Sequence, residues 1–181
     1  MRFHETKLPG AFVIEVDRHA DERGFFGRTF CQDEFAAHGL ARSFVQCNFS
    51  YNRRRGTLRG MHFQAAPHRE AKLVRCTAGV IWDAIVDLRP GSPTHLSSVW
   101  VELSAESRRM LYVPRGFAHG FQTLTDGAEV IYQMTYRYVP EAQRGFRWND
   151  PRIAIPWPLE VTAISERDQA LPCFDPETFD G

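Results

Sequence analysis

The sequence lacks several features that would place it in other classes of protein. None of its apolar runs is long enough to span a bilayer, and the first six residues lack the apolar core of a secretory signal. The 22 Lys and Arg residues balance the 22 Asp and Glu residues, which argues against a general nucleic-acid binder. We therefore expect no membrane or nucleic-acid partner, and the length of 181 residues predicts one domain over positions 1–181.

Cysteine is also scarce, and it follows no pattern. The four cysteines form no C-x-x-C pair, and their spacing matches neither a zinc site nor a disulfide framework: they are Cys31, Cys47, Cys76 and Cys173. Four reduced thiols are typical of a cytoplasmic protein, which is the location that we expect.

Signals for helices are few. A short helix is expected over residues 33–38, closed by Gly39, and a second one after Ser165, whose side chain is a suitable cap. Elsewhere short apolar runs alternate with Gly and Pro, which is typical of a β-sandwich or barrel. We predict strands at residues 71–75, 80–88, 98–103, 109–113 and 129–138.

The predicted strand over residues 129–138 carries an aromatic stripe. Even positions of a strand share one face, so Tyr132, Tyr136 and Tyr138 are expected to point together. On a straight strand Tyr132 and Tyr138 would lie about 20 Å apart, close to the length of an extended nucleotide sugar. A barrel core would give the same stripe. The phenol of Tyr132 is also a candidate proton donor, because it stays protonated at neutral pH.

Three cationic or titratable groups lie close together in the sequence. Arg59 has a rigid fork that fits a phosphate, His62 can take a proton near neutral pH, and Lys72 can stabilise a developing negative charge. Together they indicate proton chemistry on a phosphorylated or nucleotide-linked small molecule. A histidine base needs an orienting carboxylate. The sequence offers several candidates, among them Asp83, Asp87 and Asp168.

A second histidine follows a Pro-x-Gly turn. The run from Pro114 to Phe121 resembles the second motif of cupins, whose histidine often binds a metal. The first cupin motif needs His-x-His followed by Glu, whereas this chain reads His62-Phe63-Gln64, which weakens a metal site. A metal-dependent oxygenase or isomerase is therefore an alternative, with a rearranged site drawn from His62, His68, Glu70 and His119.

The run Asp21–Arg28 is compatible with two interpretations. Arg23 is placed to reach a phosphate, and Phe25 or Phe26 to stack on a nucleotide base. An ordinary β-turn explains the same residues equally well.

With these residues assembled, the chain resembles the dTDP-4-dehydrorhamnose 3,5-epimerase family over roughly Asp21 to Pro172. Any one of the shared pieces would be a weak signal, but nine in the family's order are specific. The pieces are Asp21–Phe26, Phe44–Asn48, Leu58–Gln64, Lys72–Arg75, Val86–Arg89 with Ser92–Thr94, Pro114–Phe121, Trp148–Pro151, Ile155–Pro158 and Ser165–Asp168.

The resemblance implies a mainly β, cupin-type jelly roll that forms a homodimer and needs neither a metal nor another cofactor. It implies an epimerase that inverts C3 and C5 of a nucleotide-linked 4-keto-6-deoxy hexose, converting dTDP-4-dehydro-6-deoxyglucose to dTDP-4-dehydrorhamnose. The 4-keto group acidifies the hydrogens at C3 and C5, so a proton can leave one face and return to the other through an enolate.

The resemblance also implies roles for particular residues. His62 would be the base, paired with Asp168, and Tyr132 would be the acid on the opposite face. Lys72 would stabilise the enolate oxygen, and Tyr138 would stack on the nucleotide base. Other positions match substrate contacts of the family, with the first two expected to serve the neighbouring subunit's site: Arg23, Phe26, Gln46, Asn48, Arg59 and His119.

The chain departs from the family pattern at a few positions. Arg28 stands where many members carry Glu, and Gln143 and Arg144 precede Gly145 where Glu is common. These changes leave open another nucleotide sugar, or inversion of one centre only. A non-catalytic barrel that only binds a sugar nucleotide is a further alternative, but it would have no use for both His62 and Tyr132.

Overall fold

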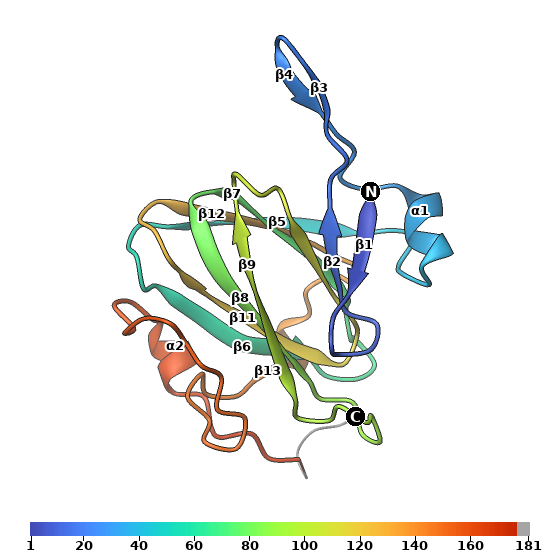
Figure 1. The fold of residues 1–181 in the computed structure, drawn as a ribbon. Coiled ribbons are helices and arrows are strands. Elements are labelled where there is room, and N and C mark those ends of the chain that lie inside the picture. Colours follow the sequence, from blue (N-terminus) through green and yellow to red (C-terminus); the bar gives the residue numbers. More distant parts are fainter. Residues whose placement is uncertain (177–181) are drawn as a thin grey trace.

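The computed structural model describes residues 1–176 and is built mainly of antiparallel strands in two facing sheets (Figure 1). The first sheet has the spatial order β1 (Arg2–Glu5), β2 (Phe12–Glu15), β10 (Met110–Val113), β7 (Lys72–Ala78), β12 (Ala128–Met134) and β5 (Gln46–Asn52). The second sheet has the order β13 (Gln143–Gly145), β6 (Leu58–Gln64), β11 (Phe117–Thr123), β8 (Val80–Asp87) and β9 (Ser98–Ser104). The predicted mainly β class is confirmed, and the predicted domain end at residue 181 lies outside the described residues.

A central core fills the space between the two sheets. Val74, Leu111 and Val130 reach it from the first sheet, and Ile85 and Phe121 reach it from the second. Alternate side chains of β8 point the other way, where Ala84 and Val86 join a separate core beneath the C-terminal segment. Since β8 is covered on both faces, its sequence is an almost continuous apolar run, which is why the strand was readily predicted.

The two predicted helices are both present. Helix α1 (Gln32–Ala37) ends before Gly39 and buries Phe35 in a third core on the outer face of the first sheet. Helix α2 (Glu166–Gln169) is capped by Ser165, whose Oγ accepts a hydrogen bond of 3.1 Å from Asp168 N. Among residues 1–176, no helix is long and apolar enough to cross a membrane.

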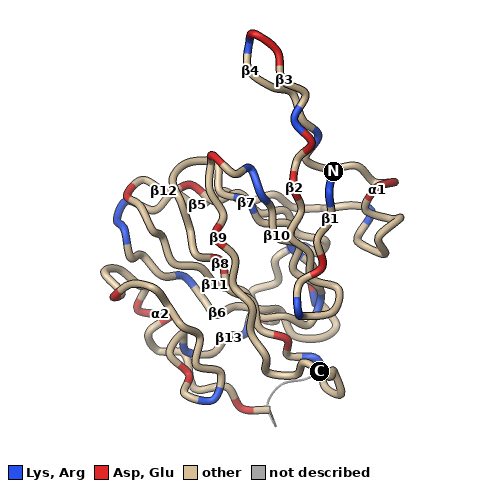
Figure 2. The backbone as a smooth tube through the Cα atoms, in the orientation of Figure 1, with Lys and Arg blue, Asp and Glu red and all other residues tan. Residues whose placement is uncertain are grey.

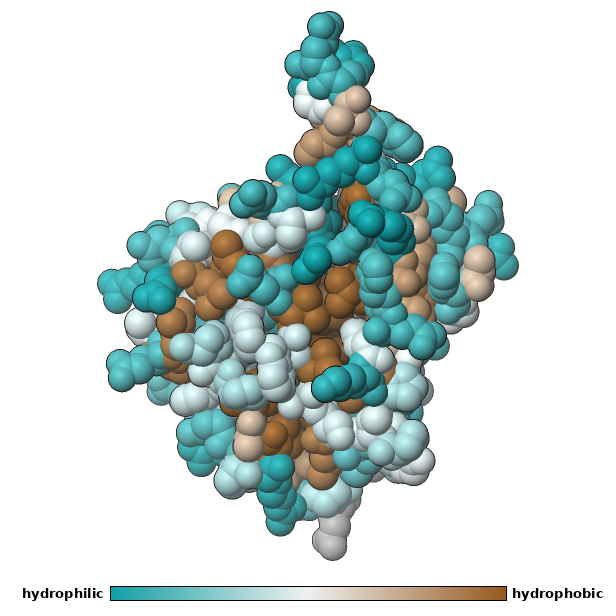
Figure 3. Space-filling model, viewed as in Figure 1, coloured by the Kyte–Doolittle hydropathy of each residue, from teal (hydrophilic) through white to brown (hydrophobic). Residues whose placement is uncertain are grey.

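A hairpin stands away from the body of the molecule (Figures 1 and 3). It consists of β3 (His19–Asp21) and β4 (Gly24–Phe26), so the run Asp21–Arg28 begins with a β-turn. Phe26 is 75% exposed, and Arg23 at the tip forms an ion pair of 2.6 Å with Asp21. Figure 2 shows charges of both signs at this tip, as over the rest of the chain.

The prediction that one strand runs from residue 129 to residue 138 is wrong at its C-terminal end. Strand β12 stops at Met134, and a bend follows. Beyond the bend, backbone groups bond to side chains of neighbouring strands: Tyr138 N donates to Gln46 Oε1 at 2.9 Å, and Val139 N donates to Gln64 Oε1 at 2.7 Å. Tyr132 and Tyr138 therefore do not share one strand face.

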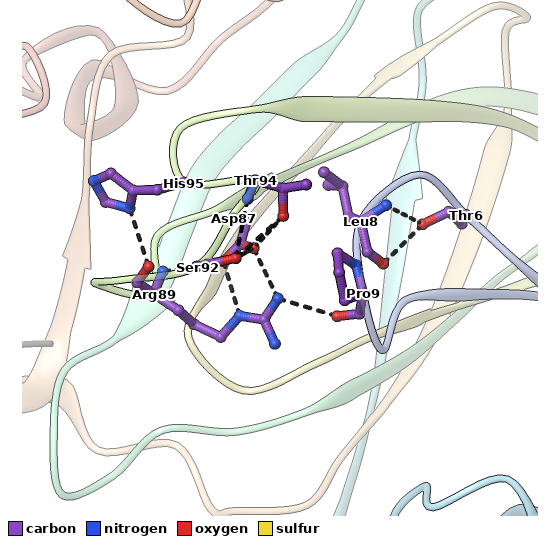
Figure 4. A network of polar contacts seen from close by, with 8 residues as sticks. All are labelled: Thr6, Leu8, Pro9, Asp87, Arg89, Ser92, Thr94 and His95. Atoms are coloured by element: carbon purple, nitrogen blue, oxygen red, sulfur yellow. Dashed lines mark hydrogen bonds and ion pairs between the residues drawn. The ribbon is translucent and has the colours of Figure 1, made fainter.

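The turn after β8 is organised by one buried carboxylate, Asp87 (Figure 4). Arg89 donates to Asp87 from Nε at 2.8 Å and from Nη2 at 2.7 Å, and the hydroxyls of Ser92 and Thr94 donate to Oδ2 at 2.6 and 2.7 Å. Arg89 Nη2 also donates to the carbonyl of Pro9 at 3.0 Å. The network thus joins the loop after β8 to the loop between β1 and β2.

Candidate active site

A cavity of about 600 Å³ opens between the two sheets at the end covered by α2. Strands β5, β7 and β12 supply one wall, β6 and β11 the other, and α2 adds Arg167 and Asp168. The predicted site residues that line it are Gln46, Asn48, Arg59, His62, Lys72, His119, Tyr132, Tyr138 and Asp168. Side chains that are far apart in the sequence therefore meet in one cavity.

His62 is held by a carboxylate from α2. Its Nε2 lies 2.8 Å from Asp168 Oδ1, and Asp168 Oδ2 accepts a hydrogen bond of 3.2 Å from Gly60 N. Burial raises the pKa of Asp168, but hydrogen bonding to His62 and the charge of His62 outweigh it, so the pKa is lowered overall. The carboxylate thus stays ionised and orients the ring, which leaves Nδ1 of His62 to accept a proton.

Lys72 begins β7 and forms a buried ion pair. Its Nζ lies 2.9 Å from Glu70 Oε1, with the two side chains 9% and 4% exposed. An ammonium group that is largely shielded from solvent in the cavity wall is well placed to stabilise a negative charge that develops on a bound molecule.

Tyr132 enters the cavity from β12, in the sheet opposite the one that carries His62. Burial raises the pKa of its phenol, and the positive charge of Arg59 offsets this only in part. The hydroxyl therefore remains protonated at neutral and mildly alkaline pH. The imidazole of His62 and a protonated phenol thus line one cavity from opposite walls.

The cavity side chains at the β5 edge of the first sheet are connected by hydrogen bonds to one another. Gln46 Nε2 donates to Asn48 Oδ1 at 3.0 Å, and Asn48 Nδ2 donates to Met134 Sδ at 3.2 Å. The hydroxyl of Tyr138 donates to Gln143 Oε1, and the ring is 42% exposed at the mouth of the cavity.

Arg59 is fixed on β6 by a hydrogen bond of 2.8 Å from its Nε to Asn52 Oδ1. The side chain is exposed, and its guanidinium lines the cavity together with that of Arg167. Two guanidinium groups form a suitable site for phosphate oxygens.

His119 lies opposite His62 in the register of β11 and β6, but the two rings have separate partners. His119 Nε2 lies 2.7 Å from Asp83 Oδ1, deep in the wall. Glu70 is paired with Lys72, and His68 packs on Tyr136, so the four residues of the alternative metal site are not gathered around one point. Within residues 1–176, no group of three or more His, Cys, Asp or Glu side chains is arranged to hold a metal ion.

Two predicted contacts, Arg23 and Phe26, lie outside this cavity, because the hairpin that carries them points away from the body (Figure 1). Arg28, which departs from the family pattern, forms an ion pair of 3.0 Å with Glu34 beside α1. Of the other departures, Gln143 lines the cavity, whereas Arg144 donates to nearby backbone carbonyls.

Sequence reasoning missed two charged residues of the cavity wall. Arg167 adjoins Asp168 in a piece that the sequence analysis singled out, so its position on the short helix was the available signal. Glu70 was considered only as a metal ligand, yet it lines the cavity beside Lys72.

Strands β6 and β11, which carry His62 and His119, approach each other closely at Gly60 and Gly120. A Cβ added to Gly60 would lie 2.6 Å from the Cα of Gly120, and one added to Gly120 would lie 2.6 Å from Met61 Sδ. Gly60 also has a φ of +125°, which side chains rarely allow. The close approach sets the spacing between His62 and His119.

Fold and site together define a mainly β protein in which one cavity gathers imidazole, phenol, ammonium and guanidinium side chains. Residues 5–176 match the family model described as dTDP-4-dehydrorhamnose 3,5-epimerase. The chain belongs to this family.

Relatives agree with this assignment. The dTDP-4-dehydrorhamnose 3,5-epimerase of Methanothermobacter thermautotrophicus is 46% identical, over 93% of this chain and 91% of that protein. The crystal structure of the enzyme of the same name from Elizabethkingia anophelis superposes with a TM-score of 0.93 at 39% identity, covering 96% of each chain. The structure of the Legionella pneumophila dTDP-6-deoxy-D-glucose-3,5-epimerase in complex with dTDP-4-keto-L-rhamnose superposes with a TM-score of 0.91 at 38% identity. The match covers 98% of this chain and 96% of that one.

Proposed function

We propose that this chain is a dTDP-4-dehydrorhamnose 3,5-epimerase, which inverts C3 and C5 of dTDP-4-dehydro-6-deoxyglucose. The observation that carries the proposal is the single cavity that holds His62 and Tyr132 on opposite walls, with Lys72 also in its lining. Membership of the family and the bound product-type sugar of the Legionella enzyme support the same substrate.

The chemistry begins with His62, which removes the proton from C3 or C5 of the sugar. The imidazolium that forms is stabilised by Asp168, 2.8 Å away. The electron pair moves to the C4 oxygen, and the ammonium of Lys72 stabilises the enolate, which lowers the barrier by about 3 kcal/mol. Tyr132 then donates its proton to the opposite face of the carbon, which inverts the centre. The C4 carbonyl re-forms as the carbon is protonated. His62 then releases its proton to solvent and Tyr132 regains one from solvent, after which a second round at the other carbon completes the reaction.

Binding follows from the remaining lining residues. Arg59 holds the diphosphate, and Tyr138 at the mouth of the cavity stacks on the thymine ring. Gln46, Asn48 and His119 supply polar contacts along the length of the ligand.

The protein acts as a homodimer in this proposal. The hairpin formed by β3 and β4 carries Arg23 and Phe26 away from their own cavity, with both side chains largely exposed. An exposed hydrophobic ring and a guanidinium on a projecting hairpin are suited to complete the nucleotide site of a neighbouring subunit. We place the enzyme in the cytoplasm, in keeping with its four free cysteines.

The proposal is tested by incubating the protein with dTDP-4-dehydro-6-deoxyglucose in heavy water and locating deuterium by NMR. The wild-type protein is expected to incorporate deuterium at both C3 and C5. The variant His62→Asn, which keeps a polar side chain but removes the basic imidazole, is expected to lose exchange at both positions, by 10²-fold or more. Undiminished exchange in that variant would remove His62 as the base.

A further inference from the structure

Glu70 carries a buried carboxylate that the proposed mechanism does not use. Its side chain is 4% exposed, and its Oε1 lies 2.9 Å from Lys72 Nζ. The second oxygen, Oε2, is buried and has no hydrogen-bond partner among residues 1–176. Buried carboxylate oxygens normally accept hydrogen bonds, because an unpaired one loses its hydration without compensation.

The backbone that follows Glu70 is held by the residue after β12. Ala71 N donates to Thr135 Oγ1 at 2.8 Å, and Thr135 N donates to Ala71 O at 3.0 Å. Glu70 lines the cavity, and Lys72 follows it by two residues at the start of β7. Glu70 is therefore a residue of the cavity wall whose carboxylate lies next to the ammonium group of Lys72.

The chemistry of a carboxylate limits what can pair with Oε2. An ionised carboxylate only accepts hydrogen bonds, so its partner must be a donor. The diphosphate of a nucleotide sugar is excluded, since its oxygens are negatively charged acceptors. The hydroxyl groups of the sugar are donors, and they lie in the same part of the ligand as the keto group.

We propose that Glu70 Oε2 accepts a hydrogen bond from the C3 hydroxyl of the sugar and thereby selects substrates that carry this hydroxyl. The inference rests on the proposed function, in which the neighbouring Lys72 holds the C4 oxygen. Of the two carbons next to C4, only C3 bears a hydroxyl, whereas C5 bears the methyl group and the ring oxygen. A side chain that already contacts the Lys72 ammonium therefore faces the C3 hydroxyl.

The test compares substrates that differ only at C3. Wild-type protein and Glu70→Ala are incubated in heavy water with dTDP-4-dehydro-6-deoxyglucose and with its 3-deoxy analogue, and deuterium entry at C5 is followed by NMR. The wild-type protein is expected to exchange C5 of the 3-deoxy analogue on the order of tenfold more slowly than C5 of the parent sugar. Glu70→Ala is expected to exchange C5 of both at similar rates.

Two controls accompany this comparison. Glu102→Ala removes an exposed carboxylate from β9, outside the cavity, and should keep the wild-type preference. The 3-deoxy-3-fluoro analogue is given to the wild-type protein alone, so that a result is obtained even if Glu70→Ala does not fold. Fluorine cannot donate a hydrogen bond, so this analogue should be at least as slow as the 3-deoxy analogue.

Several results would overturn the proposal. If Glu70→Ala slows both substrates by the same factor and so keeps the wild-type preference, the carboxylate acts only through Lys72. A fluoro analogue that reacts as fast as the parent sugar would show that no donor is needed at C3. Failure of the wild-type protein to exchange the parent sugar at all would instead reject the proposed function itself, and is thus a distinguishable outcome.

Discussion

The proton chemistry depends on how individual side chains are held. His62 is oriented through one ring nitrogen by Asp168, and that carboxylate is itself bonded to Gly60 N and located by the Ser165 cap. Tyr132, in contrast, keeps its proton because burial raises its pKa. In the proposed reaction the two groups therefore begin in complementary states, with His62 taking a proton and Tyr132 giving one.

Replacing Tyr132 by Phe should separate the two proton transfers. The base remains, so we expect Tyr132→Phe to take up deuterium from heavy water at C3 and C5. Net inversion should fall by about 10²-fold or more, because no acid donates from the opposite face. The measurement is NMR of the same sample, which reports deuterium content and stereochemistry together. Epimerisation at the wild-type rate would show that another group supplies the proton.

Much of the site was predictable from residue types, and the rest was not. Arg59, His62 and Lys72 lie close enough in sequence to suggest a joint role, and all three line the cavity. Residues alone did not single out Asp168 among many carboxylates, because its approach to His62 depends on how the chain returns to β6 more than 100 residues later. That partner came from the family resemblance.

At the scale of elements, the ends of β8 were predicted more accurately than the C-terminal end of β12. The run in β8 is apolar on two sides and was found with nearly correct ends. Strand β12 was extended too far, because aromatic residues continue the β pattern past Met134. In the structure the backbone beyond the bend donates hydrogen bonds to the side chains of Gln46 and Gln64 instead of continuing the strand. Such bonds between distant segments leave no periodic signal in the sequence.

The turn after β8 should make stability depend on pH through Asp87. Burial raises the pKa of this carboxyl, but hydrogen bonds from Arg89, Ser92 and Thr94 outweigh it and lower the pKa to about 2 from an ordinary value of 3.8. The shift corresponds to about 2 kcal/mol of stability. Because the folded-state pKa is lowered, this contribution is complete above pH 4 or so and is lost as the pH falls towards about 2.

Asp87→Asn should therefore reduce the free energy of unfolding by about 2 kcal/mol or more at pH 7, and by less at acid pH. Urea unfolding at both pH values measures this difference. Asp33→Asn on the exposed surface of α1 is the matched control and should change stability little. An equal loss at neutral and acid pH for Asp87→Asn would contradict the assigned role of the ionised carboxylate.

At the scale of the whole molecule, the hairpin of β3 and β4 projects away from the body (Figure 1), and nothing within residues 1–176 of a single chain accounts for its exposed side chains. Arg23 at its turn is exposed, and so is Phe26 at the other end of β4. In the proposed homodimer each hairpin serves the cavity of the other subunit, so every working site would draw residues from two chains.

Mixing two inactive variants tests this arrangement. One protein carries His62→Asn, and the other carries Arg23→Ala together with Phe26→Ala. We expect each alone to be weak or inactive, and the mixture to regain activity after subunit exchange, because a mixed dimer has one site with both an intact base and an intact hairpin. A mixture no more active than the sum of its parts would show that the hairpin serves its own chain or no site at all.

The contact of Gly60 with Gly120 also limits how this scaffold can be redesigned. Neither position has room for a side chain, so the part of the cavity wall between His62 and His119 cannot be reshaped by substituting either glycine without separating β6 from β11. A library of variants aimed at new sugar nucleotides should keep both glycines and vary other residues that line the same cavity, such as Phe49 and Gln143.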